Sequence, residues 1–543
     1  MPSCPITRFT GVLYEKSMKY ERWIFLLFLL VSLLQLWMTR FIPSLDGPQH
    51  LYNANVMVEL LKENELMRSF FDINEVIVGY WSGHFFLSFF KIFLPAWLAE
   101  KFFLTVYVVA MVFSFRYLIQ SINPSKGNFV SFLIFPFVYH SYLLMGYYSF
   151  SIAAIFFFLA FGYWIKYRDQ MEWKQLIIFG MIVMGIFLSH GLVYVFFGMS
   201  FVIFSLSSSL YKFLDKSEDF NFSKLIIVSL KVFLAVIPSL ILWIIYIRSV
   251  MSINSTVVST SFSFSELVIF LMRIRQLVGF NHEMEAIGYI PIFVLMVILT
   301  IVFLVLFIGG LKDKSKRIVS LFSDQNSWIF IAFAFLGLYL FAPDRISAGS
   351  LTNRFGLFFF FTSIIWLSVR KFPKTFQLIS LVVLLLSVTY TRFMHQRFYQ
   401  KLDNNISEIH ELAEYIKPNT VVYALHSSDS WITTHFQLYA VMDDPMVHLE
   451  NPQCQGQFPV VWNMESLPRC YAGNTEVTPI GAVRPKGKEF SKMEVDYITI
   501  FYQDKFWNDS TNAEWQGILK EYYEEVYVSS GSKAALWERT TLK

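Results

Sequence analysis

The sequence has little charge and little cysteine. Only 15% of its 543 residues are charged, where a soluble globular protein has about a quarter. Three cysteines are too few for a disulfide scaffold. The 44 basic and 40 acidic residues nearly balance, so the charge does not indicate a nucleic-acid partner. The chain also lacks the G-x-x-x-x-G-K-[ST] motif that cradles phosphates, so the sequence gives no support for the use of ATP or a nucleotide-sugar.

Apolar side chains make up most of what is present. Hydrophobic residues are 55% of the chain, and there are 60 Phe, 28 Tyr and 14 Trp. One globular core could not bury so many, whereas lipid accepts them on the outside of every spanning helix. The composition therefore predicts an α-helical polytopic membrane protein.

The apolar runs predict about 11 spans, or 12 to 13 if shorter runs also cross. Several approach the 20 residues or so that a helix needs to cross the hydrocarbon. No small-residue cleavage site follows the first run, which indicates a membrane helix rather than a removed signal. A short run at 85–94, closed by Pro95, is expected not to cross by itself. The runs lie near 23–38, 97–118, 128–143, 149–165, 175–189, 191–210, 226–248, 289–310, 327–342, 353–369 and 374–391.

The polar connectors differ in basic content. Six of them hold nineteen Lys and Arg in 80 positions, whereas the other four hold seven in about 120. Because cytoplasmic loops are enriched in Lys and Arg, this difference predicts a cytoplasmic amino terminus and a periplasmic carboxyl-terminal domain. We expect a multi-pass protein of a bacterial inner membrane.

Polarity predicts two domains. Residues 1–391 form the multi-span domain, with outer loops 41–81 and 249–288, and residues 392–543 form a soluble periplasmic α/β domain. In the second domain, "NTVVYAL", "VDYITIFY" and "EEVYVSS" are typical of strands, and "NISEIHELAEYI" and "NAEWQGILKEYY" of amphipathic helices. Cys454 and Cys470 fall in this domain, either as a disulfide or as two free thiols.

A carboxylate and an imidazole follow the first run closely. Asp46 and His50 lie in "PSLDGPQHLYNA", a Gly-Pro turn that opens an amphipathic segment on the predicted outer side. Ionisable groups beside spanning helices are costly, which makes them the best functional signal in such a chain. The alternative is that Asp46 only caps the helix that begins at the turn.

Other polar residues fall on the same predicted face. His84 lies in "GYWSGHFF", His140 and Tyr147 in "YHSYLLMGYYSF", and His190 in "LSHGLV". Each taken alone is typical of a hydrogen-bonded interfacial residue. Their shared side makes His84, Tyr147 and His190 candidates for lining a cavity.

The last outer connector, "APDRISAGSLTNRFGLFF", holds two arginines. Arg354 enters the start of an apolar helix and Arg345 precedes it, with Asp344 as a further candidate for lining the cavity. Guanidinium groups bind phosphate bidentately and stay charged when partly desolvated, so a lipid phosphate is a natural partner. The alternatives are pairing of Arg345 with Asp344 or a headgroup, and snorkelling of Arg354 to the interface.

These residue types fit one reaction. A carboxylate can deprotonate an acceptor hydroxyl, while an arginine neutralises charge on a phosphate leaving group. Transfer of a sugar from a polyprenyl phosphate to an extracytoplasmic glycan, lipid or protein needs both. We assign the base to Asp46, with His50 beside it, and the donor phosphate to Arg354 and Arg345.

In this layout the chain resembles the GT-C superfamily of integral-membrane glycosyltransferases, which contains protein mannosyltransferases and aminoarabinose transferases. It is also similar to a less characterised bacterial group with an Asp-x-Pro-x-His turn, an "SHG" and an "RF" pair, here Asp46 to His50, Ser189 to Gly191, and Arg354 with Phe355. The resemblance implies that Asp46 is the catalytic base and that Arg354 binds the donor phosphate.

The chain departs from the mannosyltransferase pattern at Gly47, where a second acidic residue often follows the first. This puts a paired-carboxylate or metal-bridged mechanism in doubt. A divalent metal on Asp46, His50 and His84 stays open, although their spacing matches no standard ligand set. We assign no metal or other cofactor.

Two further functions share these features. A polysaccharide polymerase or ligase also uses a long outer loop and arginines, but usually places that loop late in the membrane region. A transporter or flippase of a lipid-linked sugar would tend to carry charges within its spans, where this sequence has few. In the carboxyl-terminal domain, His426, Asp429 and His435 could contact a sugar, or could be ordinary surface residues.

Overall fold

The computed structural model describes residues 15, 17–124, 128–215, 222–252, 259–260, 262–310, 319–345, 350–454, 456, 458–463, 475–477, 483–485 and 495–540. The chain forms two compact units. The first comprises 1–35, 106–143 and 150–396, and the second comprises 36–105, 144–149 and 397–543. Helices α6 (Ala96–Ile122) and α18 (Lys374–Glu411) each contribute residues to both.

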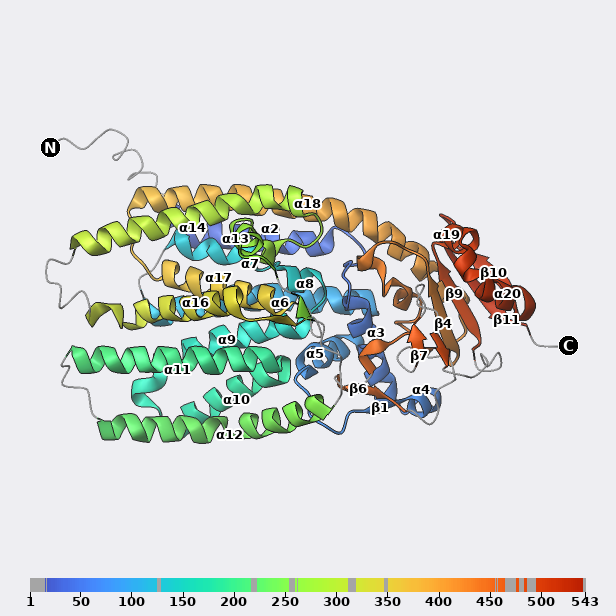
Figure 1. The fold of residues 1–543 in the computed structure, drawn as a ribbon, viewed down its shortest axis with the longest axis horizontal. Coiled ribbons are helices and arrows are strands. Elements are labelled where there is room, and N and C mark those ends of the chain that lie inside the picture. The colour runs from blue at the N-terminus through green and yellow to red at the C-terminus, as the bar shows by residue number, and fades with distance from the viewer. Residues whose placement is uncertain are drawn as a thin grey trace. The chain divides into compact units, whose positions relative to one another are not determined.

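The first unit is a bundle of apolar helices. Long apolar sequence forms helix here because lipid cannot satisfy a bare backbone, so each segment must satisfy its own. Helices α9, α11, α16 and α17 run roughly parallel in Figure 1. The bundle's remaining helices follow the predicted runs closely. The bounds are α2 (Glu21–Trp37), α9 (Tyr148–Tyr167), α10 (Trp173–Ser189), α11 (Gly191–Leu214), α12 (Phe222–Ser252), α14 (His282–Gly310), α16 (Asp324–Phe341) and α17 (Leu351–Ser368).

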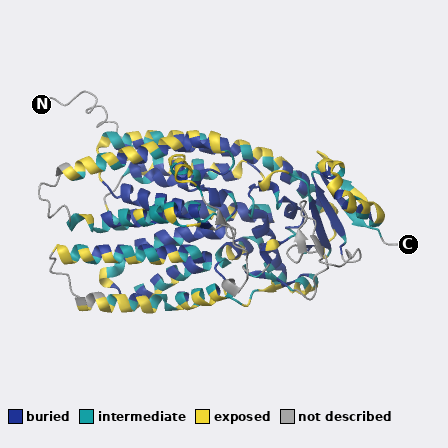
Figure 2. Ribbon diagram, viewed as in Figure 1, coloured by how far each residue is buried: buried dark blue, intermediate teal, exposed yellow. Residues whose placement is uncertain are grey.

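Seven helices are long and apolar enough to cross a membrane among the residues described, and two shorter apolar helices, 129–144 and 173–189, accompany them. The chain is therefore a multi-pass membrane protein. Helices α12 and α14 are the least buried of the seven, and exposed positions follow them along much of their length (Figure 2). Such surfaces suit contact with lipid.

Two predicted segments differ in form from a single spanning helix. The run at 128–143 is broken into η1 (Phe129–Leu133), α7 (Ile134–Phe137) and α8 (Ser141–Leu144). The run at 85–94 lies in α5 (Trp81–Lys91), which is 11 residues long. At 1.5 Å per residue it rises about 16 Å, half of the hydrocarbon thickness, so α5 is too short to cross, as expected.

Basic residues of the connectors predicted to be cytoplasmic join helices to one another. Arg116 on α6 donates two hydrogen bonds to the Glu21 carboxylate on α2, at 2.9 and 3.1 Å. Arg168, after α9, pairs in the same forked way with Asp324 at the start of α16. Bidentate pairs of this kind fix the orientation of two helix ends as well as neutralising charge.

The second unit contains a five-stranded sheet in the order β10–β11–β9–β4–β5. Strand β4 (Val421–His426) runs parallel to β5 (Val447–His448) and β9 (Tyr497–Phe501), whereas β11 (Ala534–Arg539) is antiparallel to both β9 and β10 (Tyr523–Val528). Helix α20 (Ala513–Tyr522) leads into β10. The three strands and the second amphipathic helix predicted for this region are confirmed, while the first forms the end of α18 and η5 (Leu412–Tyr415).

The same unit includes the segment that the sequence predicts to be the first outer loop. It holds α3 (Gly47–Leu61), α4 (Glu65–Phe70) and β1 (Phe71–Ile73), and β1 pairs antiparallel with β6 (Val460–Trp462). The Tyr52 hydroxyl donates to the Met446 carbonyl at 2.9 Å and accepts from the His448 amide at 2.7 Å. The carboxyl-terminal region therefore folds together with residues 36–105 rather than alone.

Candidate functional site

Asp46 precedes the first turn of α3. Its backbone N–H donates to the Met145 carbonyl at 2.9 Å, and its carbonyl accepts from the His50 amide at 3.1 Å. The Asp46 side chain makes no capping hydrogen bond to the helix. The purely structural alternative, in which Asp46 serves as the helix cap, is therefore not how this carboxylate is used.

The turn at Asp46 is held by close backbone packing. Gly146 has a φ of +87°, and a Cβ placed on it would lie 2.4 Å from the Gly47 nitrogen and 3.0 Å from the Asp46 carbonyl carbon. Only glycine adopts this conformation cheaply and permits this approach. The segment 144–149, in which Tyr147 is half-buried, thus fixes the backbone position of Asp46.

A second carboxylate lies beside this turn. Glu100, the fifth residue of α6, has 0% exposure, and its Oε1 accepts a hydrogen bond from the Tyr148 hydroxyl at 2.5 Å. A Cβ on Gly47 would lie 2.7 Å from that hydroxyl and 3.0 Å from Oε1. Neither residue was predicted from the sequence, although an ionisable residue near the start of an apolar helix is a signal for Glu100. Gly47 stands where a second acidic residue often follows the first, but Glu100 on α6 places another carboxylate beside the same turn.

His50 and His84 form a buried pair in the same unit. The His84 Nδ1 lies 3.1 Å from the Tyr80 carbonyl, which can only accept, so the proton of His84 sits on Nδ1. His84 Nε2 then accepts from His50 Nδ1 at 3.3 Å. Burial lowers the pKa of His84 to about 4. Burial and the neighbouring His84 also hold the pKa of His50 well below its usual range, so both rings are neutral at pH 7.

The carboxyl-terminal region adds one more histidine to this group. The Gln49 side-chain amide donates to His435 Nδ1 at 2.8 Å, and the Asn53 amide one turn later donates to Gln453 at 3.0 Å. The face of α3 that carries His50 is thus lined by side chains from beyond residue 430. His435, one of three candidates in that domain, is the one placed beside α3.

Arg354 and His190 meet in the first unit. Arg354, on α17, has 4% exposure, and its Nη1 lies 2.9 Å from His190 Nε2. Because a guanidinium only donates, His190 accepts through Nε2 and is neutral. The guanidinium carbon also lies 5.1 Å from the ring centres of Tyr142 and Phe150, on which it makes cation–π contacts. The fold therefore holds the Arg354 cation of α17 against α8, α9 and the junction of α10 and α11.

Asp344 and Arg345 stand at the entrance to α17. The Asp344 carboxylate accepts from the Ser350 hydroxyl at 3.0 Å and from the Thr352 amide at 3.2 Å, so it holds the first turn of the helix that carries Arg354. Arg345 belongs to β3 (Asp344–Arg345), which pairs with β2 (Ser259–Thr260). Its side chain lies outside the described residues.

Glu285 and His395 form a buried pair just outside the predicted apolar runs 289–310 and 374–391. In the first unit Glu285 and His395 both have 0% exposure, with Glu285 Oε2 3.0 Å from His395 Nε2. Glu285 also accepts hydrogen bonds from the amides of residues 279–281 at 2.7 to 2.8 Å. These hydrogen bonds show that the Glu285 carboxylate holds residues 279–281, before α14, in place.

The predicted site residues fall into two groups, one in each unit. Asp46, His50, His84 and Tyr147 share the second unit with Glu100, whereas Arg354, His190, Asp344 and Arg345 belong to the first. Among the described residues, no three His, Cys, Asp or Glu side chains are placed to hold a metal ion, so Asp46, His50 and His84 do not form a ligand set here. Cys454 is a buried free thiol, and Cys470 lies outside the described residues.

Comparison with known proteins gives structural matches alone. No family model and no curated protein matches the chain. It is similar to ArnT from Cupriavidus metallidurans in the apo state, at 10% identity over 94% of this chain and 97% of that chain, with a TM-score of 0.46. It is also similar to the same protein bound to undecaprenyl phosphate, at 11% identity over 95% of this chain and 98% of that chain, with a TM-score of 0.44. A third match is an Archaeoglobus fulgidus oligosaccharyltransferase tethered to an acceptor peptide, at 12% identity over 96% of this chain and 74% of that chain, with a TM-score of 0.42.

Identities of 10–12% and TM-scores below 0.5 say nothing about activity, so the function proposed below depends on this chain's own residues.

Proposed function

We propose that the protein is a membrane glycosyltransferase that moves a sugar from a polyprenyl-phosphate donor to a hydroxyl of an extracytoplasmic glycan, lipid or protein. The observation that carries this proposal is the Asp46 turn. It places a carboxylate at a backbone position fixed by Gly146, beside the buried Glu100–Tyr148 pair.

In this proposal Asp46 is the base. Its carboxylate takes the proton of the acceptor hydroxyl as the acceptor oxygen bonds to the anomeric carbon of the sugar. The bond between that carbon and the phosphate oxygen breaks, and the electron pair leaves with the polyprenyl phosphate. His50 lies one helical turn after Asp46, and its hydrogen bond to His84 fixes its ring orientation. We assign His50 to positioning of the acceptor beside the base.

Arg354 neutralises the phosphate that departs. A guanidinium that is 4% exposed and rests on two aromatic rings is already desolvated and oriented, so it loses little on binding an anion. His190 accepts one of its N–H groups and fixes the direction of the rest. Asp344 contributes by holding the first turn of α17, and Arg345 is a further candidate for the phosphate.

The proposed topology follows from the charge of the connectors. With the basic connectors in the cytoplasm, the amino terminus is cytoplasmic, and the turn at Asp46 and the carboxyl-terminal domain face the periplasm of a bacterial inner membrane. An acceptor would then meet the chain on the outer side, where α3 and His435 share one unit.

The proposal is tested with Asp46→Asn in the full-length protein. We expect sugar transfer from a polyprenyl-phosphate donor to fall by at least about 100-fold, the range that general-base catalysis supplies. Asp72→Asn is the matched control, because Asp72 is an exposed carboxylate of the same unit. Full activity of Asp46→Asn would remove Asp46 from the mechanism, and equal losses in both variants would point to a general electrostatic effect instead.

A further inference from the structure

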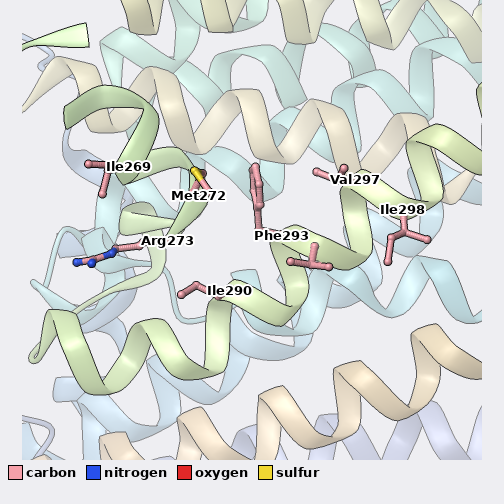
Figure 3. A pocket seen from close by; sticks show the side chains of 8 residues that line it. Ile269, Met272, Arg273, Ile290, Phe293, Val297 and Ile298 are labelled. Atoms are coloured by element: carbon pink, nitrogen blue, oxygen red, sulfur yellow. The ribbon is translucent and has the colours of Figure 1, made fainter. Parts of the chain in front are cut away.

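An apolar slot lies between α13 (Phe264–Met272) and α14 in the first unit (Figure 3). It encloses about 430 Å³. Ile269 and Met272 line it from α13, and Ile290, Val294 and Ile298 line it from α14. The side chains of these three α14 residues are 40 to 47% exposed, so the slot opens on the lipid-facing side of that helix.

The slot ends at a basic hollow. Arg273 borders the slot and also a second cavity of about 210 Å³, which Arg275, Phe270 and His282 line with it. The Arg275 guanidinium carbon lies 4.0 Å from the Phe270 ring centre, and this contact holds it at the hollow. An apolar channel that leads into a pair of arginines is complementary to a molecule with an apolar chain and an anionic head.

The dimensions and direction match a lipid of one leaflet. From Ile290 to Ile298 the slot follows nine residues of α14, a rise of about 12 Å. One leaflet contributes about half of the 30 Å hydrocarbon thickness. The basic hollow includes His282, the first residue of α14, so the charged end lies where the helix begins and the apolar end runs toward its middle.

The turn that carries the arginines is tightly defined. Ile274, between them, is fully buried with φ 44° and ψ 56°, a left-handed conformation that β-branched residues rarely adopt. A Cβ on Gly356 would lie 2.3 Å from the side-chain nitrogen of Gln276, so this turn packs directly on α17, two residues from Arg354. An occupant of the hollow would therefore touch the segment that positions α17.

We propose that this slot binds one acyl chain of an anionic glycerophospholipid, with the lipid phosphate held by Arg273 and Arg275. The depth of the slot favours this occupant, because a polyprenyl chain is much longer than one leaflet. Through Gln276 and Gly356 the bound lipid stabilises the start of α17. That consequence for Arg354 rests on the proposed function, whereas the binding itself does not.

The test measures lipid retention by the full-length protein in nanodiscs of phosphatidylcholine with one-fifth phosphatidylglycerol. The protein is extracted into detergent, and native mass spectrometry counts the lipids that stay bound. Wild type should retain phosphatidylglycerol in preference to phosphatidylcholine. Two arginines at a membrane surface predict that the Arg273→Gln/Arg275→Gln variant loses this preference by about tenfold or more. Arg248→Gln is the control, because it removes an exposed arginine at the end of α12 that lines neither cavity.

A second variant tests the slot without touching the arginines. Val294→Trp fills the apolar channel from a lipid-facing position, so it should fold and should also lose the retained phosphatidylglycerol. Retention by either variant at the wild-type level would overturn the proposal. Displacement of phosphatidylglycerol by an equimolar polyprenyl phosphate would also overturn it, by assigning the slot to the donor lipid. No sugar transfer is measured, so these outcomes hold whether or not the protein is a glycosyltransferase.

Discussion

Gly146→Ala is the substitution that most sharply tests how the fold holds Asp46. The new Cβ would lie 2.4 Å from the Gly47 nitrogen, whereas ordinary contacts begin at 3.4 Å. The two segments must therefore separate by about 1.0 Å, the difference of these distances. Both atoms nearest to the Cβ belong to backbone, so no side-chain rotation relieves the clash.

The energetic cost has two parts. Holding alanine at a φ of +87° costs about 1–2 kcal/mol, and overpacking adds about 1–3 kcal/mol. The sum, about 2–5 kcal/mol, is smaller than the stability of most domains, so the protein should fold with a displaced turn. A displacement of about 1 Å at a catalytic group costs roughly 100-fold in rate.

Two measurements check this prediction, the kcat of sugar transfer and the thermal unfolding temperature in detergent. Both should fall in Gly146→Ala. Gly198→Ala is the control, because nothing lies within 4 Å of a Cβ at that position of α11 and alanine favours helix, so it should match or exceed wild type. Wild-type kcat and unfolding temperature in Gly146→Ala would show that the segment 144–149 does not set the position of Asp46.

Three further predictions concern the buried polar groups. Tyr148→Phe leaves Glu100 buried without its hydroxyl donor and should lower the free energy of unfolding by about 1–3 kcal/mol in chemical denaturation, whereas Tyr148→Phe combined with Glu100→Gln should recover part of that loss. Because the pKa of His84 is lowered to about 4, the unfolded chain binds more protons between pH 6.5 and 4. The free energy of unfolding should therefore fall as the pH drops through that window, by up to about 3 kcal/mol. In a series of melting curves at different pH, His84→Gln should show a weaker dependence of stability on pH than wild type. An equal pH dependence in the two proteins would contradict this prediction. Arg354→Lys keeps the charge but loses the forked donor and the stacking, so it should raise the KM for the lipid donor at least about tenfold, and a variant with unchanged KM would show that Arg354 does not contact the phosphate.

Local pattern was enough to predict much of the fold. The apolar runs located the helices of the bundle because lipid imposes one solution, helix, on any long apolar segment. The turn before α3 could be found because Asp46, Gly47 and Pro48 are neighbours in sequence and together make a helix start. Alternating and periodic patterns located β4, β9, β10 and α20 in the same way.

Hydropathy did not predict where helix α18 ends. Polarity changes near residue 391, yet α18 continues to Glu411 because its amphipathic sequence has no proline or glycine before Pro418 to stop it. The change in polarity near residue 391 marks where the apolar surface ends, whereas the helix itself continues to Glu411.

Partners distant in sequence could not be predicted. Glu100 meets Tyr148 across 48 positions, and no local pattern indicates that the Asp344 carboxylate accepts from the Thr352 amide eight positions later. For this reason the sequence suggested a cavity role for Asp344, which holds a helix end, and did not suggest Glu100, which is fully buried next to the Asp46 turn.

The central claim is that the chain breaks a bond between a sugar and a lipid phosphate. The most direct measurement supplies the purified, reconstituted protein with a panel of radiolabelled polyprenyl-phosphate sugars and membrane extracts as acceptors. We expect that one donor is consumed, with free polyprenyl phosphate and labelled acceptor formed in equal amounts. Movement of an intact sugar-lipid across the vesicle membrane, with no donor cleaved, would contradict it.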